Sequence, residues 1–157
     1  RWPVVKTTGQ RKAYKVFGLI DFFTGRLFYR GIDGRFNSET YQAFLLKVLA
    51  ETTRHLVIIQ DGAKYHTSKA MREFFAAHQD RITVYQLPSY SPDYNPIEFL
   101  WKNVKREATH NQYFPEFELL TLSVDQALAY YAKHPDEVKS LMGLYCQSMA
   151  AGVPLAA

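Results

Sequence analysis

The sequence predicts an α/β fold in which helices flank a mixed β-sheet. Strand-like and helix-like segments alternate along most of the 157 residues, one predicted strand is a continuous apolar run, and several segments have apolar residues at helical spacing. Alternation of this kind is typical of layered α/β domains, and a continuous apolar strand favours parallel pairing. We expect one domain, because a chain of this length forms a single hydrophobic core.

The first predicted elements are a hairpin and a helix. Residues 13–20 have the composition of a strand, Thr24 and Gly25 indicate a turn, and residues 26–30 form the returning strand. Asn37 precedes a helix that extends to about Thr53, because Asn is a favoured N-cap and apolar residues then recur at helical spacing. These apolar residues are Tyr41, Phe44, Leu45, Val48 and Leu49.

The next segments predict two further strands with a helix between them. Residues 56–59 are apolar and rich in β-branched side chains, so we expect a parallel strand buried on both faces. Ser68 is the expected N-cap of the following helix, and residues 82–87 form the second strand.

Three helices complete the predicted order. Residues 88–96 contain three prolines and form a stiff loop, which leads to a helix with Asn95 at its N-cap and Pro96 at its first position. Two more helices are expected near residues 115–132 and 135–148, each preceded or begun by a proline.

Composition excludes several classes of protein. Apolar residues make up 47% and charged residues 22%, which argues against disorder. The apolar runs are shorter than the ~20 residues of a membrane span, and no signal segment opens the chain, so we expect no membrane partner. Cys146 is the single cysteine, which excludes an internal disulfide and a cysteine-based zinc site. A reducing cytoplasm is the expected setting.

Positive charge is concentrated at the start of the chain. Residues 1–35 carry a net charge of +6, residues 36–108 carry +1, and residues 109–157 carry −3. Basic residues interleaved with aromatic ones suit a polyanionic partner such as nucleic acid. A solvated sheet face with ordinary Lys and Arg side chains explains the same charge, and both interpretations stay open.

Asp61 is the first candidate for a catalytic residue. It follows a predicted buried strand, and sites in open α/β sheets gather at the carboxyl ends of strands. The alternative is an Asx-turn in which Asp61 closes a turn onto Gly62. His66 lies five residues later, with Lys64 between them, and is either a polar surface residue or a contact for a phosphate or an attacking water.

Glu98 is the second candidate. It could form a capping box with Asn95 or an ion pair with Lys102. It could also face the same crevice as Asp61, since the rigid loop before it fixes the start of its helix. Helical spacing places Glu98, Lys102 and Lys105 on one face, with Arg106 beside them. Carboxylates that hold a cation beside basic residues that contact phosphates suit a metal-dependent nuclease.

Two segments resemble motifs of DDE transposases of the mariner-like superfamily, in its bacterial insertion-sequence branch. Residues 57–66, VIIQDGAKYH, resemble the second catalytic strand, and residues 87–101, LPSYSPDYNPIEFLW, resemble the third-carboxylate motif. Residues 9–31 are similar to the hairpin before the first helix, so the resemblance covers roughly residues 8–110. The supporting loop of the second motif is its most specific part: Tyr90, Pro92, Asn95, Pro96 and Trp101.

The resemblance implies a ribonuclease-H-like, retroviral-integrase-like fold. It implies that Asp61 is the second and Glu98 the third carboxylate of a two-metal site for Mg²⁺ or Mn²⁺. The implied activity is endonucleolytic cleavage and strand transfer of double-stranded DNA at transposon ends and target, in DNA transposition and recombination of a mobile element. The implied setting is a homodimer on nucleoid DNA in a prokaryotic cytoplasm. The expected DNA contacts are Lys64, His66, Lys102, Lys105, Arg106, Arg11 and Lys12.

One departure from the family pattern concerns its first catalytic Asp, which belongs to a strand before the hairpin. Residues 1–11 contain no Asp or Glu, and Asp21 falls in the predicted hairpin turn. We therefore expect residues 1–157 to be a partial catalytic domain, with its core at about 8–110 and C-terminal helices at about 115–149. It would lack the first, central strand and the helix-turn-helix part, and would be inactive alone. A catalytically inactive DNA-binding or dimerising remnant and another ribonuclease-H-like metal nuclease are the alternatives.

Overall fold

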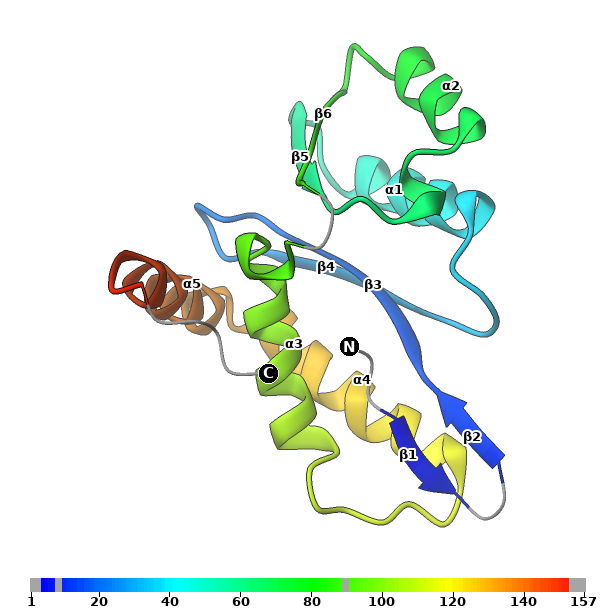
Figure 1. The fold of residues 1–157 in the computed structure, drawn as a ribbon, viewed down its shortest axis with the longest axis vertical. Coiled ribbons are helices and arrows are strands. Elements are labelled where there is room, and N and C mark those ends of the chain that lie inside the picture. The colour runs from blue at the N-terminus through cyan, green and yellow to red at the C-terminus, as the bar shows by residue number, and fades with distance from the viewer. Residues whose placement is uncertain (1–3, 8–9, 89–90, 153–157) are drawn as a thin grey trace. The chain divides into compact units, whose positions relative to one another are not determined.

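The structure is a computed structural model that describes residues 4–7, 10–88 and 91–152 (Figure 1). From residue 15 onward, its strands and helices follow the predicted order. The strands are β1 (Val4–Thr7), β2 (Gln10–Ala13), β3 (Lys15–Ile20), β4 (Leu27–Ile32), β5 (Leu56–Gln60) and β6 (Ile82–Gln86). The helices are α1 (Ser38–Glu51), α2 (Lys69–Ala77), α3 (Ile97–Ala108), α4 (Phe117–Lys133) and α5 (Pro135–Ala150), with short 3₁₀ helices η1 (Lys64–His66) and η2 (Pro92–Tyr94).

The chain divides into two compact units, which we describe separately. The first unit combines Arg1–Asp33 with Pro96–Ala157, and the second unit is Gly34–Asn95. The described strands pair in three two-stranded ladders: β1 with β2 and β3 with β4 are antiparallel, and β5 with β6 is parallel. Both strand directions of the expected mixed sheet are therefore present.

The predicted hairpin of the first unit is present as β3 and β4, with a tight turn between them. The Asp21 carboxylate accepts hydrogen bonds from the backbone N–H groups of Phe23 (3.0 Å) and Thr24 (3.2 Å). Gly25 has a φ of +78°, a left-handed conformation that glycine adopts without strain. Asp21 is thus engaged in closing the hairpin turn.

The segment before this hairpin differs from the prediction of one strand over residues 13–20. Residues 10–13 belong to β2, which pairs with β1, and β3 begins at Lys15. Tyr14 separates the two strands, and its hydroxyl donates a 2.7 Å hydrogen bond to Oδ1 of Asp125 in α4. Strand propensity alone did not reveal this break, because the contact that holds Tyr14 comes from more than 100 residues away.

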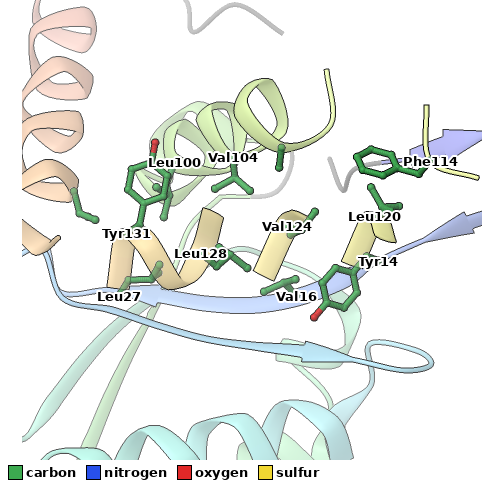
Figure 2. Packing of buried hydrophobic residues seen from close by; sticks show 12 residues of the cluster. Tyr14, Val16, Leu27, Leu100, Val104, Phe114, Leu120, Val124, Leu128 and Tyr131 are labelled. Carbon is green, nitrogen blue, oxygen red and sulfur yellow. The ribbon is translucent and has the colours of Figure 1, made fainter. Parts of the chain in front are cut away.

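The core of the first unit lies between the β3–β4 hairpin and the three C-terminal helices. Figure 2 shows α4 side chains between strand residues on one side and α3 residues on the other. The strands contribute Val16 and Leu27, α3 contributes Leu100 and Val104, and α4 contributes Leu120, Val124, Leu128 and Tyr131. This core holds α3, the helix that carries Glu98, against the hairpin.

Trp101 of the supporting loop motif packs against β3 at a glycine. A Cβ atom on Gly18 would lie 2.6 Å from Cη2 and Cζ2 of the Trp101 ring, closer than real Cβ contacts allow. Glycine at this position therefore permits the close approach of α3 to the strand. Two residues that the sequence analysis assigned to separate motifs form one packing contact.

The second unit contains α1, β5, α2 and β6. Asn37 is the N-cap of α1, as predicted: its Oδ1 accepts from the Thr40 N–H (2.8 Å), and Thr40 Oγ1 accepts from the Asn37 N–H (3.1 Å). Ser68 caps α2 by accepting from the Met71 N–H (3.2 Å), also as predicted. All five apolar residues predicted for the inner face of α1 are buried.

The prediction that β5 is buried on both faces is wrong. Ile58 and Gln60 are 3% and 6% exposed, whereas Val57 and Ile59 are 63% and 56% exposed. Successive side chains of a strand point to opposite faces. On the face that carries Gln60, the Tyr41 hydroxyl of α1 donates a hydrogen bond to Gln60. An apolar run predicts a strand, but the number of layers around it depends on the tertiary structure.

The start of α3 also differs from the prediction by one residue. The helix begins at Ile97, and Pro96 is its N-cap, with helical backbone angles (φ −58°, ψ −29°) and no side-chain capping hydrogen bond. Asn95 therefore lies one residue before the N-cap, so the predicted capping position was wrong.

None of the helices in the described ranges is long and apolar enough to cross a membrane.

We predict that Leu128→Ala lowers the free energy of unfolding by about 2–5 kcal/mol, because it leaves a cavity in the core of the first unit. Leu128 is fully buried in α4. The measurement is urea denaturation followed by circular dichroism. Leu122→Ala in the same helix is the control, because Leu122 is 52% exposed and its truncation should change stability by no more than about 0.5 kcal/mol. Equal losses of unfolding free energy in the two variants would contradict the burial of Leu128 in this core.

Candidate active site

Asp61 lies at the carboxyl end of the parallel β5–β6 pair. Gln60 is the last residue of β5, pairs with Gln86 of β6, and its carbonyl accepts a 2.7 Å hydrogen bond from the Leu87 N–H. Asp61 is the next residue, and its side chain is 50% exposed. The structure therefore confirms the predicted placement of this carboxylate directly after a strand.

The Asp61 carboxylate is held by two hydrogen bonds to the same oxygen. Nδ1 of His66 lies 2.8 Å from Oδ1, and the Ala63 N–H donates to Oδ1 at 3.1 Å. The hydrogen bond from His66 lowers the pKa of Asp61 below its usual value, and this effect outweighs partial burial, which raises it. The carboxylate is therefore ionised at neutral pH.

The Ala63 hydrogen bond forms an Asx-turn, because Asp61 accepts from the backbone two residues ahead. The structural alternative for Asp61 is thus present in the molecule, with Ala63 as the donor. It does not conflict with a ligand role, because a carboxylate has about four acceptor positions and the turn uses only one oxygen.

Aromatic side chains cover most of the His66 side chain. Its side chain is 10% exposed, and its ring centroid lies 4.5 Å from that of Tyr41 and 4.3 Å from that of Tyr65. Burial raises the pKa of both tyrosines, so both remain protonated at neutral pH. Phe36 stacks on Tyr65 at 5.7 Å, which extends the aromatic wall behind the His66 ring.

Sequence reasoning missed one residue that holds this candidate site together, Gln60. It is a buried polar side chain whose Oε1 accepts from the Tyr41 hydroxyl (2.7 Å) and whose Nε2 donates to the His66 carbonyl (3.3 Å). These two bonds connect α1 to the segment after β5. The available signal was a polar residue at the end of an apolar strand, which burial makes costly unless it is hydrogen-bonded.

Glu98 lies in the first turn of α3, in the first unit. Lys102, Lys105 and Arg106 follow in the same helix, and the last two lie in its final turn, where positive charge is favourable. The Arg106 guanidinium donates to Oδ1 of Asn103, which is buried. The spacing of Glu98, Lys102 and Lys105 by four and three residues places them on one helix face.

The predicted site residues are distributed over the two units. Asp61, Lys64 and His66 belong to the second unit and Glu98 with its basic neighbours to the first, so the approach of Asp61 to Glu98 stays a prediction. Among the described residues, no group of three or more His, Cys, Asp or Glu side chains is arranged to hold a metal ion.

The other predicted residues are placed as follows. Lys64 is exposed in η1, and Pro92 lies in η2. Arg11 and Lys12 lie in β2, and their side chains are outside the described part of the structure, as is residue Tyr90. The DNA contacts expected from Arg11 and Lys12 therefore stay predictions.

The comparisons with solved structures concern the fold. The catalytic domain of Mos1 mariner transposase has a TM-score of 0.65 at 17% identity, covering 94% of this chain and 78% of that chain. A chain of a simian T-cell lymphotropic virus intasome has a TM-score of 0.57 at 16% identity, covering 79% and 45%. At this identity the likeness is one of fold, and it confirms the ribonuclease-H-like α/β class expected from the sequence.

The comparisons with sequences concern the family. The Tcb2 transposase of Caenorhabditis briggsae is 43% identical over 53 residues, which are 34% of this chain and 19% of that protein. The Tc3 transposase of Caenorhabditis elegans is 35% identical over 75 residues, 45% of this chain and 22% of that protein. The matched segment thus spans about a fifth of these relatives. The model of the DDE superfamily endonuclease domain matches residues 1–121, well over half of the sequence. The chain therefore belongs to the DDE superfamily of endonucleases.

Proposed function

We propose that this chain supplies the second and third carboxylates, Asp61 and Glu98, of a transposase active site that uses Mg²⁺ or Mn²⁺. The observation that carries the proposal is the ionised Asp61 carboxylate at the end of β5, whose described hydrogen bonds all go to Oδ1. Hard cations such as Mg²⁺ prefer carboxylate oxygens, so the chemistry of these donors suits such an ion. The Mos1 catalytic domain has been solved with Mg and with Mn.

The residues around the two carboxylates have separate tasks in this proposal. Asp61 and Glu98 provide anionic oxygens to the cations, and Lys102, Lys105 and Arg106 contact DNA phosphates. Two divalent ions held by these carboxylates would supply activation of the attacking hydroxyl and stabilisation of the leaving oxygen in an in-line displacement at phosphorus.

The proposed substrate is double-stranded DNA at transposon ends and at the target, which is cleaved and joined. A strand transfer complex of Mos1 transposase supports this, with a TM-score of 0.64 at 18% identity, covering 98% of this chain and 47% of that chain. We further propose that the protein belongs to the bacterial insertion-sequence branch of the mariner-like superfamily. It would then act as a homodimer on nucleoid DNA in a prokaryotic cytoplasm.

Metal binding is the direct test of Asp61. We expect Asp61→Asn to weaken Mn²⁺ binding at least about tenfold, because the amide removes the anionic ligand. The measurement is a Mn²⁺ titration followed by electron paramagnetic resonance. Asp80→Asn is the control, since Asp80 is an exposed carboxylate in the same unit and the change in charge is identical. Equal affinity of the Asp61 variant and the wild-type chain would contradict the proposal.

DNA cleavage by residues 1–157 alone should be weak or absent. Asp61 and Glu98 supply two carboxylates, and two divalent cations need more anionic ligands than these to be held close together. The assay is nicking of supercoiled plasmid with Mg²⁺ or Mn²⁺, beside the Asp61→Ala and Glu98→Ala variants. Robust nicking that both variants abolish would mean that the chain builds a complete site by itself.

The basic face of α3 predicts salt-dependent DNA binding. We expect Lys102→Gln with Lys105→Gln to reduce the slope of log affinity against log salt by about 1.8, because each lost phosphate contact removes about 0.9. Fluorescence anisotropy with duplex DNA at several salt concentrations measures this slope. The matched control is Lys47→Gln with Lys69→Gln, two lysines of α1 and α2 that pair with Glu51 and Glu73. Equal slopes in both double variants would contradict the proposal that Lys102 and Lys105 contact DNA phosphates.

A further inference from the structure

We propose that His66 is a positioning residue for Asp61, which holds Oδ1 so that Oδ2 is the oxygen that binds the divalent cation. This inference rests on the proposed function, because it concerns how the chain prepares one ligand of that site. The observation that carries it is the double contact between the His66 ring and Asp61, described next.

The proton of the neutral His66 ring is assigned by its two acceptors. Nδ1 lies 2.8 Å from Oδ1 of Asp61 and 3.0 Å from the backbone carbonyl oxygen of the same residue. An ionised carboxylate and a carbonyl can only accept hydrogen bonds, so Nδ1 must carry the hydrogen. The neutral ring is therefore the Nδ1–H tautomer, with its lone pair on Nε2.

The two oxygens of the Asp61 carboxylate differ in their surroundings. Oδ1 accepts from His66 Nδ1 and from the Ala63 N–H at 3.1 Å. Within residues 4–7, 10–88 and 91–152, these are the hydrogen bonds that the carboxylate makes, and neither involves Oδ2. A cation that binds Oδ2 therefore displaces no hydrogen bond, whereas binding to Oδ1 competes with two N–H donors.

The His66 ring is itself fixed, as a positioning residue must be. Tyr41 and Tyr65 contact the ring, and the Gln60 amide donates to the His66 carbonyl. Gln60 is in turn held by the Tyr41 hydroxyl. The His66 side chain is 10% exposed and the Asp61 side chain 50% exposed, so the histidine supports the carboxylate from the protein side.

Loss of such a supporting hydrogen bond is measurable in metal affinity. Hydrogen bonds to ligating groups orient them, and removal of the partner typically costs about 10–100-fold in affinity. For Asp61, a lost bond from His66 frees the carboxylate to rotate about its side-chain torsions. The cation must then restrict this rotation when it binds.

Two substitutions of His66 test whether its hydrogen bond to Asp61 matters, or only the size and polarity of its side chain. In His66→Asn the amide nitrogen is as many bonds from Cβ as Nδ1 is, so it can donate to Asp61. In His66→Gln the amide nitrogen corresponds to Nε2 and the donor next to Asp61 is lost. We expect His66→Gln to weaken Mn²⁺ binding by about 10–100-fold, and His66→Asn to retain most of the wild-type affinity.

The outcomes distinguish this inference from the proposed function. If Asp61→Asn has no effect on Mn²⁺ binding, the proposal of a metal site at Asp61 is overturned. If Asp61→Asn weakens binding while the two His66 variants have equal affinities, the site stands and the positioning role is overturned. A second measurement needs no variant: ¹H–¹⁵N correlation spectra of the wild-type chain, in the neutral state of His66, should show the Nδ1–H tautomer. An Nε2–H tautomer would overturn the inference.

Discussion

The buried amide of Gln60 is the interaction on which the site in the second unit depends. Its oxygen accepts from Tyr41 of α1 and its nitrogen donates to the carbonyl of His66, so one side chain joins a helix, a strand end and the following 3₁₀ turn. A buried amide without these partners would cost roughly 1–3 kcal/mol, which is why the three segments must form together. Asp61 follows Gln60 directly in the chain, and its direction is set by this arrangement.

In the first unit, side-chain packing holds helix α3 beside the β3–β4 hairpin. Trp101 reaches β3 only because Gly18 lacks a Cβ, and Leu100 and Val104 fill the space against α4. Glu98 lies on the same helix, within one turn of Leu100 and Trp101. A catalytic side chain on a well-packed helix loses little entropy when it binds a ligand, because its backbone is already ordered. Core packing in this unit therefore serves the site chemistry that we propose.

In the function that we propose, the basic residues and the carboxylates have complementary roles. Phosphate contacts supply affinity that depends on salt and little on sequence, whereas the carboxylates supply the reaction. Lys102, Lys105 and Arg106 share α3 with Glu98, so phosphate contacts and one ligand would move as a single rigid element. Asp61 depends on a separate hydrogen-bonded network in the second unit, so its orientation can be tested without changing the basic residues of α3.

Many elements of the fold could be predicted from the sequence alone. Periodicity predicted α1 and its buried face, capping residues predicted the starts of α1 and α2, and two motifs predicted the fold class and the DDE superfamily. The sequence could not show that Val57 and Ile59 are exposed, that Tyr14 interrupts a strand, or that Gln60 and His66 orient Asp61. These features depend on contacts between residues distant in the chain or on the number of layers around a strand. Local propensity and spacing carry no information about such contacts, and only the tertiary structure decides them.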